Sequence, residues 1–174
     1  VNHVENSNQM FMLQADSKPR IVRFAKLDRS EDNVVCLISL QDNNILLHDI
    51  ATSYTEGPTL YKNELPHSTI TDMQIFRNQA FLVLNDTGKL SVYYLKWNST
   101  RRPSAPSRLS TNEAMHERLP FVMDCQNDKF TCFNVVEQHE ASNGDLIVGT
   151  MKGVIKFYKW IPKSNKFEII PKEI

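Results

Sequence analysis

The residues of this chain that could carry chemistry are few, and their spacing fits neither a metal site nor a catalytic group. His139–Glu140 lacks the second histidine of a zinc-protease helix and lies in polar sequence before Asn143–Gly144. Cys125 and Cys132 lie seven positions apart, whereas structural zinc sites pair cysteines with about two to four residues between them. We therefore expect no metal and no cofactor.

Motifs of nucleotide-binding and acyl-transfer enzymes are also missing from the sequence. It contains no glycine-rich phosphate loop and no G-x-S-x-G nucleophile turn. The acidic residues are scattered singly, mostly in turn-like sequence, where Asp and Asn hydrogen-bond to the local backbone. The sequence therefore predicts a protein that is not an enzyme.

One short motif could be a modification site. Arg101-Arg102-Pro103-Ser104 resembles the substrate pattern of basophilic kinases, and Arg108 adds positive charge nearby. Phosphorylation of Ser104 would add a charge of about −1.5 to −2 beside these arginines. Two alternatives remain: a solvated loop that carries the motif by chance, or a short basic contact to the phosphates of a nucleic acid.

The bulk composition limits the partners. Twenty Lys and Arg balance twenty Asp and Glu, so the net charge indicates no general attraction to nucleic acid or to an anionic membrane. No stretch approaches about 18 apolar residues, which predicts no membrane-spanning segment. Three cysteines are an odd, sparse set, typical of a reducing compartment where Cys serves as a small buried hydrophobe. We expect an intracellular protein, in the nucleus or the cytoplasm.

Apolar runs in this sequence are short, rich in β-branched and aromatic residues, and separated by turn residues. The run 34–40 is followed by the turn cluster 41–44 and then by the run 45–50, which is the pattern of a β-hairpin. The same arrangement returns at 80–95 and at 145–158. A further strand-like run precedes each hairpin, and another follows it, at 20–27, 59–61, 70–76, 121–123, 130–136 and 167–170.

The sequence thus predicts an all-β fold of three four-stranded antiparallel units. A four-stranded unit of this kind exposes two broad apolar faces and is not stable alone. Radial stacking of such units buries these faces, which is the architecture of a β-propeller. A different all-β propeller or a β-sandwich is the alternative fold.

The third strands carry a resemblance to a known family. His48–Asp49, Tyr93–Tyr94 and Tyr158–Lys159 align with the Trp-Asp pair that ends the third strand of a WD-repeat blade. The likeness is one of pattern, since only Asp49 keeps the acidic residue, no Trp is retained, and no Gly-His pair opens a unit. The resemblance implies three blades of a WD-like β-propeller that form an incomplete ring.

The spacing of the aligned positions agrees with this interpretation. His48 and Tyr93 lie 45 residues apart, inside the roughly 40–45 residues of a WD unit, whereas Tyr93 and Tyr158 lie 65 apart. The polar, Ser- and Pro-bearing segment 98–118 accounts for the excess as an insertion between the third and fourth strands of the middle blade. We expect one propeller segment over 1–174, with blades at about 19–65, 69–125 and 129–171.

Three blades do not close a ring, because closed propellers have about four to eight. We expect the remaining blades to come from elsewhere in the parent chain or from a partner subunit, and the isolated segment to aggregate. The run 10–13 is a candidate for an extra strand of an adjacent blade.

The resemblance implies a non-catalytic scaffold for protein–protein interaction within a multi-subunit complex. A nucleic-acid-facing propeller subunit of an RNA or chromatin assembly is the alternative. One face should collect the turns and linkers at 42–44, 66–69, 86–89, 126–129 and 151–153, while the other carries the insertion. The candidate interaction surface comprises Asp42, Asn43, His67, Lys89, Trp97, Arg101, Arg102, Arg108, Lys152 and Trp160, the two tryptophans being placed at strand exits.

Overall fold

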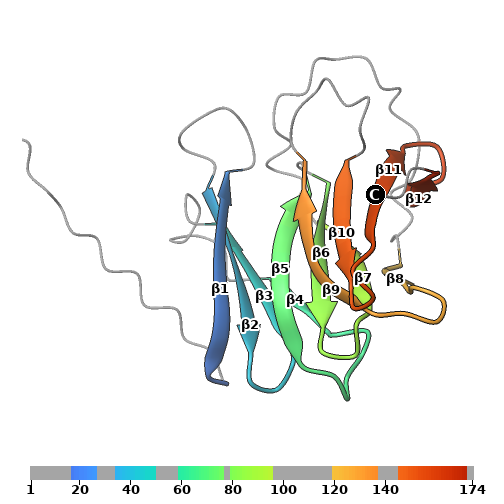
Figure 1. Ribbon diagram of the computed structural model, residues 1–174. Coiled ribbons are helices and arrows are strands. Elements are labelled where there is room, and N and C mark those ends of the chain that lie inside the picture. The colour runs from blue at the N-terminus through green and yellow to red at the C-terminus, as the bar shows by residue number, and fades with distance from the viewer. Residues whose placement is uncertain are drawn as a thin grey trace, which may run out of the picture.

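Twelve strands occupy most of the chain that the computed structural model describes, namely residues 17–26, 34–49, 59–76, 79–95, 119–136 and 145–171. They form three four-stranded antiparallel sheets, so the predicted all-β fold is confirmed. No helix that is long and apolar enough to cross a bilayer occurs within these ranges. Figure 1 shows the sheets side by side in chain order, from blue to red.

Each sheet, called a blade below, takes four consecutive strands in the order of the chain. Blade 1 contains β1 (Pro19–Lys26), β2 (Val34–Leu40), β3 (Ile45–Asp49) and β4 (Thr59–Tyr61). Blade 2 contains β5 (Ile70–Phe76), β6 (Ala80–Asn85), β7 (Leu90–Tyr94) and β8 (Phe121–Met123). Blade 3 contains β9 (Phe130–Val135), β10 (Leu146–Thr150), β11 (Ile155–Ile161) and β12 (Lys166–Ile170).

The pairing of second and third strands confirms the alignment made from the sequence. His48 pairs with Cys36, Tyr93 with Phe81, and Tyr158 with Leu146. The partners Cys36, Phe81 and Leu146 each lie four residues before the last residue of their strand. The three aligned residues therefore occupy one structural position in three successive blades.

The sequence patterns of the strands follow from which faces are covered. Both faces of blade 2 are covered by neighbouring blades, and every residue of β6 is buried, which explains its continuous apolar run. In blade 3 the burial alternates along β10, as expected of a sheet with one well-covered face.

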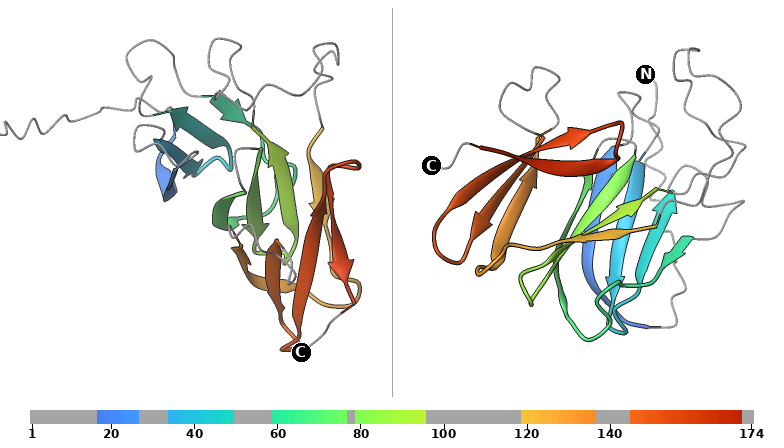
Figure 2. Two further views of the ribbon diagram at one scale, coloured as in Figure 1. Left: turned by 90° about the horizontal axis from the view of Figure 1, so that it is seen from above. Right: turned by 90° about the vertical axis from the view of Figure 1, so that its right-hand side faces the viewer.

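The three blades are arranged side by side with their first strands adjacent. β5 contacts β1 on one side and β9 on the other. One apolar cluster joins blades 1 and 2, and a second joins blades 2 and 3. Seen from above, the blades splay apart, with blade 1 in blue and teal at one end and blade 3 in orange and red at the other (Figure 2). The sheets do not close on each other, so they form an open arc.

Two of the segments interpreted from the sequence lie outside the described residues. They are the insertion at 98–118 and the apolar run at 10–13.

The turn between β6 and β7 packs closely on the linker that leads to blade 3. Gly88 has a φ of +76°, and a Cβ atom at this position would collide with the backbone and Cβ of Lys129. The Gly88 carbonyl also accepts a hydrogen bond from the Phe130 amide at 3.0 Å. Gly153 has a similar φ of +81° in the corresponding turn of blade 3, but no atom lies within 4 Å of the Cβ site.

This pair of glycines separates backbone strain from packing between blades. We expect Gly153→Ala to lower the free energy of unfolding by about 1 kcal/mol, because of the left-handed conformation alone. Gly88→Ala should cost about 1–3 kcal/mol more, since the Lys129 backbone must also move. Urea denaturation of both variants measures the difference, and equal losses would show that the turn does not lock blades 2 and 3 together.

Candidate interaction surfaces

The turns that join second and third strands gather at one end of the three blades, together with the linkers between blades. Hydrogen bonds connect each turn to a neighbouring linker: Asn43 Nδ2 to the Pro66 carbonyl (3.3 Å), Asp86 N to the Thr69 carbonyl (2.9 Å), and Met151 N to the Lys129 carbonyl (2.8 Å). This end, called the turn surface below, brings together the turns and linkers that the sequence assigned to one face.

Five of the predicted surface residues lie on the turn surface. Asp42 is exposed, and its carboxylate accepts hydrogen bonds from the backbone and side-chain nitrogens of Asn44, at 3.1 and 2.7 Å, so it shapes the turn. Asn43 adopts a φ of 63° within that turn. His67 and Lys152 are exposed, and Lys89 forms an ion pair with Asp124 at 3.2 Å.

Asp128 anchors the third turn to the start of β9. The Thr150 hydroxyl and the backbone amides of Lys129 and Lys152 donate to its carboxylate and hold the pKa of Asp128 below its usual value. The carboxylate therefore remains ionised in mildly acidic solution, and the turn keeps its anchor there.

Trp160 was wrongly predicted to lie on a contact surface. It is 3% exposed and packs between blades 2 and 3, with its ring centroid 5.4 Å from that of Phe76 and 5.0 Å from that of Phe167. The reason is the length of β11, which continues three residues beyond the predicted end at 158. Trp160 thus follows Tyr158 on the same buried face, and Asp145 accepts a hydrogen bond from its backbone amide at 2.8 Å.

The other predicted site residues lie outside the described residues. They are Trp97, Arg101, Arg102, Arg108 and the candidate phosphosite Ser104.

A buried polar network fixes blade 2 against the linker from blade 1. The Tyr93 hydroxyl accepts a hydrogen bond from the Glu64 amide at 2.8 Å and donates to Asn63 Oδ1 at 3.3 Å. Ser68 Oγ donates to Asn85 Oδ1 at 2.9 Å, and Asn63 Nδ2 reaches the same oxygen at 3.4 Å. Burial raises the pKa of Tyr93 to about 12, so the phenol stays protonated and keeps its role as donor.

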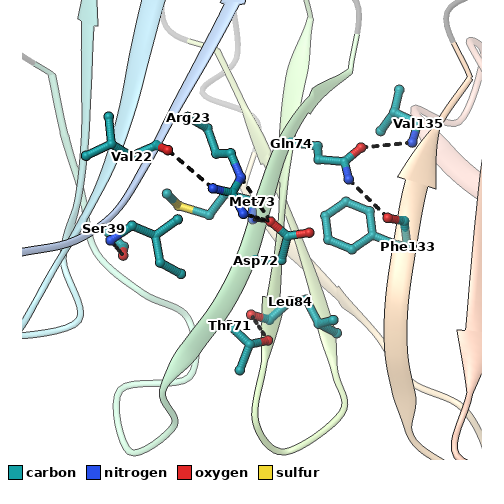
Figure 3. Close-up of polar contacts among 11 residues, drawn as sticks. Val22, Arg23, Ser39, Thr71, Asp72, Met73, Gln74, Leu84, Phe133 and Val135 are labelled. Atoms are coloured by element: carbon teal, nitrogen blue, oxygen red, sulfur yellow. Dashed lines mark hydrogen bonds and ion pairs between the residues drawn. The ribbon is translucent and has the colours of Figure 1, made fainter.

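Polar side chains on the first strands connect neighbouring blades (Figure 3). Arg23 of β1 donates to Asp72 Oδ1 of β5 from Nη2 at 2.9 Å and from Nε at 3.2 Å. Gln74 of β5 binds the free backbone edge of β9, because its Nε2 donates to the Phe133 carbonyl and its Oε1 accepts from the Val135 amide, both at 3.0 Å. The Gln74 amide thereby takes the place of one peptide group of a paired strand.

These contacts between blades were not predicted from the sequence. The signal that could have revealed them is a polar residue at one repeated position of three otherwise apolar first strands. The strand pairings place Arg23 opposite Leu37, Gln74 opposite Leu82, and Asn134 opposite Ile147, which are equivalent positions.

An open groove of about 430 Å³ lies between the first strands near their C-terminal ends. Phe24, Ile75 and Val135 contribute to its lining, together with the polar side chains of Arg23, Gln74 and Asn134. The lining holds no paired nucleophile and base. Across the described residues, no three His, Cys, Asp or Glu side chains come together as metal ligands do.

Blade 1 exposes positions that are buried in the other two blades. The pairing of each first strand with its second strand contains one register shift. Phe24, Ile75 and Val135 lie at the same distance from that shift, so they are equivalent positions of the three blades. Ile75 and Val135 are 8% and 9% exposed because the preceding blade covers them, whereas Phe24 is 67% exposed. Val22, at 42% exposure, likewise corresponds to buried positions in blades 2 and 3. We call this surface the leading face. Val22 and Phe24 are its exposed members, whereas Cys36, Ile38 and Leu46 on the same face are only 6–8% exposed.

Blade 3 exposes the side that, in blades 1 and 2, is covered by the following blade. Ile155 of β11 is equivalent to Ile45 and Leu90, since each pairs with the corresponding residue of the second strand. Ile45 and Leu90 are fully buried by the following blade, whereas Ile155 is 41% exposed. We call this surface the trailing face; Ile147, Ile155, Phe157, Asn134 and Cys132 share it.

The cysteines differ in their surroundings. Cys36 and Cys125 are buried, and burial raises the pKa of the Cys36 thiol. Cys132 is exposed on the trailing face, so the expectation of a buried cysteine was wrong at this position. Its Sγ lies over Gly149, where a Cβ atom would come within 2.7 Å of it.

Comparison with known families and with curated proteins found no match for the chain.

The Tyr93 network can be tested by removing one hydroxyl group. We expect Tyr93→Phe to lower the free energy of unfolding by about 1–2 kcal/mol at neutral pH, because the Glu64 amide and Asn63 lose a buried partner. In the parent protein, Tyr93 stabilises the fold below the ordinary phenol pKa of 10.0, and this contribution is lost as the pH rises toward about 12. Ultraviolet titration should show one phenol fewer ionising near pH 12 in the variant; no change there would contradict the assignment.

The contact between Gln74 and β9 gives a second test. Gln74→Ala should cost about 1–2 kcal/mol of unfolding free energy, since it leaves two backbone groups of β9 without their partner. The unfolding free energy of Gln74→Glu should lie between those of the parent protein and Gln74→Ala. A carboxylate accepts from the Val135 amide but does not donate to the Phe133 carbonyl. Gln79→Ala, at an exposed position, serves as the control and should change stability by less than about 0.5 kcal/mol. Equal stability of all three variants would show that Gln74 does not hold the blades together.

Proposed function

We propose that this chain is a non-catalytic scaffold, a segment of a WD-repeat-like β-propeller that binds other proteins within a multi-subunit assembly. The observation that carries the proposal is the exposure of interface positions at both ends of the arc. Phe24 is 67% exposed and Ile155 is 41% exposed, although their equivalents in the chain are at most 9% exposed. Apolar positions with this pattern favour surfaces that protein partners cover.

The turn surface supports the same proposal. Its loops are held by hydrogen bonds to linkers and by the anchoring of Asp128, so the arc presents a preorganised set of polar groups. Preorganised loops on a rigid scaffold bind partners at a lower entropic cost than mobile loops. The WD-like character rests on the shared register of His48, Tyr93 and Tyr158.

The alternative, a propeller that faces nucleic acid, has weaker support. Two cations of the turn surface lie beside carboxylates, Lys89 beside Asp124 and Lys152 beside Asp128. Such pairing reduces the positive potential that phosphate binding requires. Binding to RNA or DNA that weakens steeply with rising salt would favour this alternative. The free cysteines support our proposal of an intracellular setting in the nucleus or cytoplasm.

The scaffold proposal predicts the size of the native particle. Tagged chain in extracts of its native cells should run in an assembly larger than its 20.1 kDa mass. Phe24→Asp and Ile155→Asp place a charge on the leading and trailing faces and should release the chain from that assembly. Gln79→Asp places the same charge at an exposed position between β5 and β6, outside both faces and outside the turn surface, and should leave the assembly intact.

Protein partners should be identified by cross-linking mass spectrometry of the same particle. A chain that runs at its monomer mass in native extracts, with or without the substitutions, would contradict the scaffold proposal.

A further inference from the structure

We infer that Asn85 accepts an N-linked oligosaccharide in the unfolded chain, and that a glycan there prevents blade 2 from packing on the linker that follows blade 1. The inference goes beyond the scaffold proposal, because it concerns the folding of one junction inside the chain and involves no partner. It follows from the position of a glycan acceptor triplet within a buried polar network.

The triplet Asn85-Asp86-Thr87 has the form Asn-x-Ser/Thr, in which an oligosaccharide is attached to the asparagine. Acceptor asparagines ordinarily lie in surface loops, because the glycan is bulky and hydrophilic. Asn85 instead ends β6, pairs with Ile70 of β5, and is 2% exposed. Asp86 and Thr87 are exposed in the turn that follows. The triplet thus combines an exposed hydroxyl residue with a buried acceptor.

The acceptor atom itself is buried. Transfer from a lipid-linked oligosaccharide forms a bond between the asparagine Nδ2 and the first sugar carbon, while the bond from that carbon to the lipid diphosphate breaks. The amide loses one proton, and the lipid diphosphate leaves. In the folded chain Asn85 Nδ2 is buried, and the neighbouring Oδ1 accepts from Ser68 Oγ and Asn63 Nδ2. The amide therefore faces the linker rather than solvent.

The backbone of Asn85 keeps the side chain in this direction. Its amide donates to the Lys89 carbonyl at 3.0 Å, and its carbonyl accepts from the Gly88 amide at 2.9 Å. Because side chains alternate along a strand, Asn85 shares its face with Val83 and Phe81, which are fully buried in the cluster that joins blades 1 and 2. A rotation that exposed the Asn85 side chain would therefore break the pairing of β6 with the start of β7.

A glycan on Nδ2 would displace the linker residues that surround it. Asn63 and Ser68 are 8% and 3% exposed, and Asn63 Oδ1 also accepts from the Tyr93 hydroxyl. Even the first sugar ring adds volume and hydroxyl groups to this packed interior, where overpacking and unpaired polar groups both destabilise. A glycosylated chain should therefore lose the junction between blades 1 and 2. The nucleus or cytoplasm, the setting that we propose for this chain, attaches no such oligosaccharide.

The test directs the full chain into the endoplasmic reticulum of cultured cells with a cleavable secretion signal. Thr100→Ala is present in every variant, so that the second triplet, Asn98-Ser99-Thr100, is not an acceptor. Thr87→Ser keeps the triplet at Asn85, whereas Thr87→Ala removes it, and both leave Asn85 unchanged. The glycan is measured by the mobility shift on endoglycosidase treatment, and folding by the fraction that resists limited proteolysis.

We expect Thr87→Ser to carry the glycan and to be digested, because the junction between blades 1 and 2 does not form. Thr87→Ala should stay unglycosylated and give a several-fold larger resistant fraction. Both variants made in the bacterial cytoplasm, where the oligosaccharide is not attached, serve as the matched control. They should be equally resistant there, since Thr87 is exposed.

Three results would overturn the inference about Asn85. They are a Thr87→Ser chain that carries no glycan, glycosylated and unglycosylated chains of equal protease resistance, and a difference between the two variants made in bacteria. None of these results bears on the scaffold proposal, whose own test is the dependence of the native particle on Phe24 and Ile155.

Discussion

The whole arrangement depends on one constraint: a flat, apolar sheet must bury both of its faces. Phe76 and Phe81 lie on opposite faces of blade 2, and both are fully buried because one packs toward blade 3 and the other toward blade 1. No single four-stranded sheet achieves this burial by itself, so the blades stack and their first strands come together. The arc, the turn surface and the exposure of Phe24 and Ile155 at its two ends are consequences of this stacking.

Polar groups set the geometry that apolar burial leaves open. Apolar burial is non-directional and does not by itself select one relative position of two sheets. A buried hydrogen bond is directional and is satisfied in one arrangement. Tyr93 fixes the position of the linker before blade 2, and Gln74 fixes the position of β9 along β5. The arc is therefore held by many weak apolar contacts and oriented by a few directional ones.

Much of the fold could be predicted from the sequence, because strand periodicity and turn chemistry are local properties. The bounds at 34–40, 59–61, 70–76 and 121–123 agree with the structure, and the alignment of Tyr93 with Tyr158 is confirmed by strand pairing. The error at Trp160 arose at a strand end, where local sequence does not reveal how far pairing continues. The role of Gln74 was missed because its partner, the edge of β9, lies 59 to 61 residues away along the chain.

The complete burial of β6 has a consequence for how the molecule opens. In stacked architectures, stability is close to a sum of unit terms and nearest-neighbour terms, and blade 2 has two neighbours while each end blade has one within the chain. Amide protons of β6 should therefore exchange with solvent only through global unfolding, whereas those of β4 and β12 exchange through smaller fluctuations. The end faces, which we propose that partners cover, belong to the units that should open most readily. A partner bound there would slow local opening, and the chain would then be degraded more slowly than without it.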